Sequence, residues 1–120
     1  MSKTSKRKPD LDAEQMTVLR GTLDMLVLST LGDVPMHGYA IALALQRATD
    51  DVLRVEEGSL YPALYRMEKK GWVRSSWGRS EANRRARYYQ LTAAGKRHLE
   101  RQTSGWARFV EAVGKVIAEA

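Results

Sequence analysis

The spacing of the hydrophobic residues changes after Gly71, and this change constrains the fold more than any other feature of the sequence. Before Gly71, apolar residues recur every three or four positions, which is typical of amphipathic helices. After it, Val73 to Trp77 and Arg87 to Leu91 are rich in β-branched or aromatic residues, and a polar loop from Gly78 to Ala86 separates them. The sequence therefore predicts an α+β chain that is mostly helical and contains one β-hairpin.

Two helices are expected in the first half of the chain. The first runs from Glu14 to Leu31 and has apolar residues on several faces. Such a helix must be covered on most sides, and a small domain covers only one side of a terminal helix, so we expect a second chain to cover the rest. After a turn at residues 32–35, a second helix is expected from Gly38 to about Thr49. Its expected buried stripe comprises Ile41, Leu45 and Ala48.

A third helix is expected after a connector of residues 50–57. Ser59 is a residue type preferred at helix N-caps, and Pro62 would lie in the first turn, where its missing N–H costs nothing. Gly71 is well placed to end this helix. The residues expected on its buried face are Leu60, Ala63, Leu64 and Met67.

A final helix is expected after Thr92, which is a second candidate N-cap. The spacing of 4, 3, 4, 3 and 4 that is typical of a helix–helix contact is found at Leu99, Thr103, Trp106, Val110, Val113 and Ile117. Two interpretations stay open: the stripe joins a second copy of the chain, or it folds back onto its own domain. The residues expected at a dimer interface are Leu19, Leu23, Leu26, Thr103, Trp106, Phe109, Val110, Val113 and Ile117.

The charge of the chain favours a polyanionic partner or a membrane surface. Lys and Arg number 20 against 14 Asp and Glu, which gives a net charge of +6. The longest apolar stretch, Leu23 to Leu31, is too short to span a bilayer, so no membrane insertion is expected. The absence of cysteine excludes disulfides and Cys-ligated zinc, and the cytoplasm is the simplest expected location.

The order of three helices and a hairpin is that of a winged helix-turn-helix, in which the third helix enters the DNA major groove. The outward face of the third helix agrees with this, because serine, tyrosine, arginine and lysine donate to phosphates and base edges. The DNA contacts expected from this helix are Ser59, Tyr61, Pro62, Tyr65, Arg66, Lys69 and Lys70. The alternative is a solvated helix whose tyrosines only pack.

The hairpin tip concentrates positive charge, with four arginines within nine residues and one acid, Glu81. This repulsion is costly unless phosphates relieve it, and arginine can bridge phosphates or enter a narrow minor groove. The contacts expected from this wing are Arg79, Asn83, Arg84, Arg85 and Arg87. The alternative is a charged loop in solvent.

One domain is expected, because 120 residues divided between two would leave each core too small. We expect residues 1–12 to form a disordered basic arm and residues 13–92 to form the winged helix-turn-helix domain. Residues 93–120 are expected to form the dimerisation helix.

Catalysis finds little support in the sequence. The two histidines, His37 and His98, are far apart and have no metal-spaced partners, and His37 is better explained by the turn into the second helix. Ser59 has no base within sequence reach, and no glycine loop could cradle a phosphate. No enzyme activity, cofactor or metal is expected.

Four segments together resemble the PadR family of transcriptional regulators. They are residues 19–24 (LRGTLD), 37–39 (HGY), 58–64 (GSLYPAL) and 87–92 (RYYQLT), and the resemblance covers about residues 17 to 110. The tip at residues 83–86 and the positions of Trp72 and Trp77 look most like a short subgroup often found near bacterial export permeases.

The resemblance implies a dimeric repressor of an inverted-repeat promoter, whose last helix crosses to the partner's first helix and which a small molecule or another signal releases. It implies no catalytic residues and identifies no effector residues. Its DNA-contact pattern maps onto Ser59, Tyr61, Pro62, Tyr65 and the basic wing. Two other classes stay open: a protein-interaction module that docks on a transporter or another partner, and a protein that binds single-stranded DNA or RNA.

Overall fold

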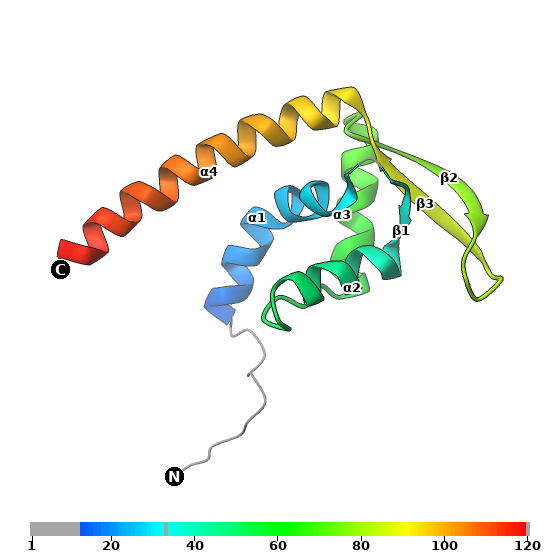
Figure 1. Ribbon diagram of the computed structural model, residues 1–120, viewed down its shortest axis with the longest axis horizontal. Coiled ribbons are helices and arrows are strands. Elements are labelled where there is room, and N and C mark those ends of the chain that lie inside the picture. Colours follow the sequence, from blue (N-terminus) through cyan, green and yellow to red (C-terminus); the bar gives the residue numbers. More distant parts are fainter. Residues whose placement is uncertain (1–12, 33, 120) are drawn as a thin grey trace, which may run out of the picture.

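Residues 13–32 and 34–119 are described in the computed structural model, with side chains from residue 22 to residue 118 apart from residue 33. The arm expected over residues 1–12 lies outside the described part. The elements in chain order are α1 (Ala13–Leu31), β1 (Met36–His37), α2 (Gly38–Ala48), α3 (Glu57–Lys69), β2 (Val73–Arg79), β3 (Arg85–Leu91) and α4 (Ala93–Glu119). They confirm the expected winged helix-turn-helix, an α+β fold that is mostly helical (Figure 1).

One hydrophobic core joins α1, α2 and α3 to the base of the hairpin. Its members are Leu23, Val27, Leu28, Leu31, Ile41, Leu45, Val55, Leu60, Ala63, Leu64, Met67, Val73, Tyr89 and Leu91. Fully burying a leucine or isoleucine side chain stabilises a fold by about 1.5–3 kcal/mol. The buried face of α3 is therefore fixed against α1 and α2, as its periodicity predicts.

The side chain of His37 caps α2, as its place before the second helix suggested: its Nδ1 accepts a hydrogen bond from the backbone N–H of Ala40 at 3.1 Å. Ile41 and Leu45 are buried as predicted. The prediction for Ala48 is wrong, because this last residue of α2 extends past the core and is exposed.

The expected start of α3 is also wrong. The helix begins at Glu57, because the N–H groups of Ser59 and Leu60 both donate to the Glu56 carbonyl at 2.9 Å. Ser59 is therefore inside the helix, and Pro62 lies in its second turn rather than its first. The predicted stop is confirmed, since Gly71 has a φ of +80°, which favours glycine.

The strands of the wing are longer than expected. Cross-strand pairing continues from Val73–Leu91 out to Arg79–Arg85, which leaves a tip of residues 80–84 rather than 78–86. The additional pairs form because Asn83, with a φ of 59°, makes a tight turn and its N–H donates to the Ser80 carbonyl at 2.8 Å. The two-residue strand β1 was not predicted, and it pairs with β3 to make a three-stranded sheet of order β1-β3-β2.

The helix α4 begins as predicted, since the Thr92 hydroxyl accepts a hydrogen bond from the Gly95 N–H at 3.0 Å. The first part of α4 packs against α1 and the core, where Leu99 is partly buried. This first part of α4 therefore packs on its own chain. From Trp106 onward the described side chains are exposed, and Figure 1 shows this end of α4 on the opposite side of the molecule from the wing tip.

Candidate nucleic-acid interface

The helix α3 is anchored by one face and presents the other to solvent. The core side chains Leu60, Ala63, Leu64 and Met67 have no exposed surface, whereas Tyr65 is 62% exposed. All seven residues predicted to contact DNA from this helix are exposed: Ser59, Tyr61, Pro62, Tyr65, Arg66, Lys69 and Lys70. A rigid helix with hydroxyl and cationic groups on its open face can enter a major groove.

Glu68 ties α3 to the wing. Its carboxylate accepts a hydrogen bond from the Ser75 hydroxyl at 2.6 Å and lies 3.4 Å from the guanidinium of Arg87. Arg87 also donates to the Ser75 hydroxyl at 2.9 Å. Together these contacts hold α3 and the wing at a fixed relative position, so the two form one surface.

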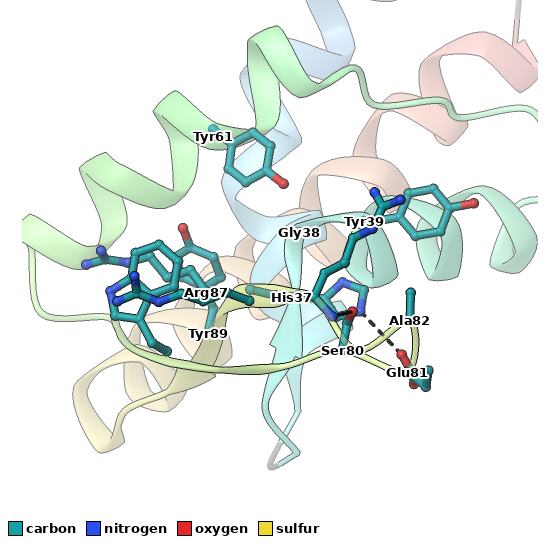
Figure 2. Close-up of a pocket in the computed structure, with 13 residues that line it drawn as sticks. His37, Gly38, Tyr39, Tyr61, Ser80, Glu81, Ala82, Arg87 and Tyr89 are labelled. Carbon is teal, nitrogen blue, oxygen red and sulfur yellow. Dashed lines mark hydrogen bonds and ion pairs between the residues drawn. The ribbon is translucent and has the colours of Figure 1, made fainter.

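A groove separates the wing from the start of α2 and from α3 (Figure 2). Its lining combines aromatic rings with arginines and includes the predicted contacts Tyr61, Arg84, Arg85 and Arg87. A second groove adjoins it and shares Tyr61 and Arg87, and it adds Tyr65 and Lys69. The structure therefore brings six predicted contacts to one continuous surface.

Tyr61 lies against the start of α2. A Cβ atom at Gly38 would come within 2.5 Å of the Tyr61 hydroxyl, so glycine at this position leaves room for the ring, which Figure 2 shows beside Gly38. Burial, and secondarily the charge of Glu57, raises the pKa of Tyr61. The phenol therefore stays protonated and can donate a hydrogen bond.

The wing tip is held by internal contacts. The Arg79 guanidinium donates to the Asn83 carbonyl at 3.3 Å, and the Tyr88 hydroxyl donates to the Arg79 carbonyl at 2.8 Å. Glu81 lies 3.7 Å from His37, and a backbone hydrogen bond, followed by the bond to His37, lowers the pKa of Glu81. These contacts place the tip beside the N-terminus of α2.

Six predicted contacts line neither groove: Ser59, Pro62, Arg66, Lys70, Arg79 and Asn83. Arg66 lies 2.8 Å from Asp24 of α1, and the Lys70 amine sits 4.9 Å from the centre of the Trp72 ring. Arg66 and Lys70 therefore have protein partners that the sequence did not reveal.

The groove residues that were not predicted as contacts include His37, Tyr39 and Trp77. Tyr39 and Trp77 are 65% and 55% exposed. The alternation of strand residues could have placed Trp77 on the same face as Val73, four residues further toward the tip. The sequence assigned His37 to the turn into the second helix and gave Tyr39 no role beyond the family resemblance.

The exposed part of α4 carries a second candidate surface, which is apolar. The exposed members of this stripe are Trp106, Phe109, Val110, Val113, Val116 and Ile117. Among the other residues expected at a dimer interface, Thr103 is exposed, Leu26 is partly buried, and the side chain of Leu19 lies outside the described part. Leu23 lies in the core of its own chain, which leaves it little surface for a partner.

A shallow groove lies where this stripe meets α1. Thr22 and Met25 of α1 line it together with Gln102, Gly105, Trp106 and Phe109. Among the described residues, the Oε1 atom of Gln102 is buried without a hydrogen-bond partner. A buried acceptor of this kind costs free energy until a donor reaches it.

The described part of the chain holds neither a metal site nor a membrane-spanning helix. No group of three or more His, Cys, Asp or Glu side chains there could hold a metal ion. No helix there combines the length and apolarity needed to cross a bilayer.

The family match and the similar solved structures point to one family. Residues 27–101 match the family described as "Transcriptional regulator PadR-like family". A transcriptional regulator structure from Clostridium thermocellum (Cth-833) is similar, with a TM-score of 0.75, 30% identity and coverage of 82% of this chain and 96% of that one. A PadR family regulator from Eggerthella lenta has a TM-score of 0.72 and 34% identity, and the match covers 85% of this chain and 87% of that one.

Two curated relatives have no described function. "Uncharacterized protein X" of Lysinibacillus sphaericus is 27% identical over 96 residues, which cover 80% of this chain and 88% of the relative. An uncharacterized 37.1 kDa protein in transposon TN4556 of Streptomyces fradiae is 44% identical over 84 residues, or 70% of this chain. The match spans only 23% of that longer protein.

Proposed function

Because this chain belongs to the PadR-like family of transcriptional regulators, we propose that it is a homodimeric repressor that binds an inverted repeat in double-stranded DNA. The observation that carries the proposal is the surface formed by α3 and the wing. Glu68 fixes the two elements together, and their shared grooves bring tyrosine, lysine and arginine side chains to one face.

In this proposal α3 enters the major groove and the wing lies along the flanking backbone. Tyr61, Tyr65 and Lys69 supply donors to base edges and phosphates from α3. Arg84 and Arg85, exposed near the wing tip, neutralise phosphates or enter the adjoining minor groove. Arg87 mainly holds the wing in place, since Glu68 and Ser75 already engage its guanidinium.

The dimer is proposed to form through α4. Its apolar stripe reaches 71% exposure at Val116, and a contiguous exposed patch of this kind marks an interaction site. The α1 and α4 helices of a second copy would cover the stripe and could supply a donor to the Gln102 acceptor. Because a two-fold axis relates the copies, two α3 helices would meet successive major grooves roughly 34 Å apart.

Repression would follow from occupation of promoter DNA by the dimer, which places its site of action in the cytoplasm. We also propose, from the family resemblance alone, that a small molecule or another signal releases the repressor from DNA. The family comprises transcriptional regulators, and we assign the chain no enzymatic step.

The proposal is tested by selecting sequences from a random duplex library with the full chain. We expect enrichment of an inverted repeat whose half-sites are centred about 10 bp apart, one turn of B-DNA. Recovery of no duplex motif contradicts sequence-specific DNA binding, and recovery of a single unpaired half-site contradicts the dimer.

A further inference from the structure

Trp77 stands out among the aromatic residues of the wing. It lies on β2 opposite Arg87, on the strand face that also carries the buried residue Val73. Unlike Val73, its side chain is 55% exposed and lines the groove between the wing and α3. Nothing in the core or the cross-strand pairing requires so large a ring there.

Two guanidinium groups flank the indole. The Cζ atom of Arg85 lies 4.3 Å from the ring centre and that of Arg87 lies 5.5 Å away. These are cation–π distances, which orient the arginines without neutralising them. Trp77 keeps more than half of its surface open even with both arginines beside it.

Single exposed aromatic side chains are ordinary and need no explanation. Trp77 differs because it shares a groove with Tyr39, which is 65% exposed, and Tyr61, which is 41% exposed. Aromatic rings interleaved with arginines suit a sugar–phosphate strand, because guanidinium groups pair with phosphates while a ring packs against deoxyribose or an unstacked base.

We propose that Trp77 contacts the deoxyribose–phosphate strand that lies in this groove when duplex DNA is bound, at the crossing from the major groove read by α3 to the minor groove beside the wing. This inference rests on the proposed DNA-binding function and adds a contact that carries no charge. The indole packs on the sugar while Arg85 engages the neighbouring phosphate.

The absence of charge gives the test its signature. In the full chain, Trp77→Ala is expected to weaken duplex binding by about five-fold or more, the lower end of the range for removing an aromatic stacking contact. The salt dependence of binding should stay unchanged in this variant, whereas Arg85→Ala should reduce the slope by about 1. Trp77→Phe keeps a ring and is expected to retain most of the affinity. Val52→Ala, at an apolar residue that is 42% exposed outside the groove, is the matched control.

A second readout does not depend on the stability of Trp77→Ala. Binding of the selected duplex should change the tryptophan emission of the wild-type chain, because the Trp77 indole contacts the DNA. Trp77→Phe leaves only the other two of the three tryptophans in the chain, so it should abolish most of that change. The same emission change in Trp77→Phe overturns the inference.

Two further outcomes also overturn it. If Trp77→Ala binds the duplex with wild-type affinity, Trp77 makes no contact with DNA, although DNA binding itself stands. If Trp77→Ala reduces the salt slope as much as Arg85→Ala does, Trp77 only orients the arginines. If the wild-type chain selects no duplex at all, the proposed DNA-binding function is wrong. This result is distinguishable from a failure of the Trp77 inference alone, in which the wild-type chain still binds DNA.

Discussion

Arg66 of α3 forms an ion pair with Asp24 of α1, with 2.8 Å between Nη2 and Oδ1. The Arg66 side chain is 54% exposed and the Asp24 side chain is 27% exposed. An ion pair of this exposure typically contributes no more than about 1 kcal/mol to stability. Its significance is positional. It links the helix proposed to read DNA to the helix that packs on α4, which carries the proposed dimer surface.

This pair separates two roles for Arg66. Asp24→Asn and Arg66→Ala should lower the free energy of unfolding by similar small amounts, at most about 1 kcal/mol each. Because Arg66→Ala also removes a cation from the exposed face of α3, it should weaken duplex binding more than Asp24→Asn does. Chemical denaturation and fluorescence anisotropy measure the two effects. Equal loss of affinity in both variants would show that Arg66 acts only through α1.

The wing arginines should account for part of the salt dependence. Replacing Arg84 and Arg85 together with alanine should weaken binding to all duplexes and reduce the slope of log affinity against log salt by about 2, one for each lost phosphate contact. Binding isotherms at several salt concentrations provide the measurement.

A matched control removes the same charge elsewhere. Arg97 and Arg108 are exposed on α4, away from the grooves beside α3 and the wing. The Arg97→Ala/Arg108→Ala variant should keep most of the wild-type slope. An unchanged slope in the wing variant, or equal slopes in both variants, contradicts the wing assignment.

The apolar stripe of α4 should determine the oligomeric state. Val110 and Val113 are 47% and 36% exposed, so aspartate at both positions should leave the fold intact and disrupt association. Sedimentation should give the mass of a dimer for the wild-type chain and about 13.5 kDa for Val110→Asp/Val113→Asp. A variant that still sediments as a dimer contradicts the proposed interface. The loop variant Val34→Asp, at a residue that is 69% exposed, should remain dimeric.

His98 should make stability depend on pH. Its ring stacks on Trp72 with centroids 3.6 Å apart, and burial, followed by the charges of Arg101 and Lys70, lowers its pKa, while Asp24 opposes them. As the pH falls, the His98 imidazole is therefore protonated in the unfolded chain, at about pH 6.5, before it is protonated in the folded chain. The contribution of His98 to stability is present above that pH and is lost as the pH falls through the lowered, folded-state value.

His98→Phe keeps a stacked ring and removes the titration. The free energy of unfolding of this variant should fall less than that of the wild type between about pH 7 and about pH 5. Parallel curves for the two proteins contradict the assignment. His98→Gln, which loses both the ring and the charge, should be destabilised at every pH.

The elements with a strong local pattern could be predicted from the sequence. The buried face of α3 follows from spacing alone, and Gly71 and Thr92 act at helix ends as their chemistry predicts. Ser59 was misplaced because N-cap preference is local, whereas the hydrogen bonds to the Glu56 carbonyl start the helix earlier. The two residues of β1 are too few to carry any pattern.

The composition of the candidate site was predictable, but its partners were not. The chain order indicates which residues of α3 and the wing are exposed, yet 42 positions separate Arg66 from Asp24 and 19 separate Arg87 from Glu68. Such pairs depend on tertiary packing. Leu23 illustrates the same limit, since an apolar stripe does not show whether its own core or a partner covers it.

In the proposed function, two linked copies present their α3 helices and wings to one duplex. Hydroxyl-radical footprinting of the full chain on its selected duplex measures this arrangement. We expect two symmetric protected regions, centred about 10 bp apart and extended at their outer edges by the wings. A single protected region, or protection that follows no two-fold symmetry, contradicts it.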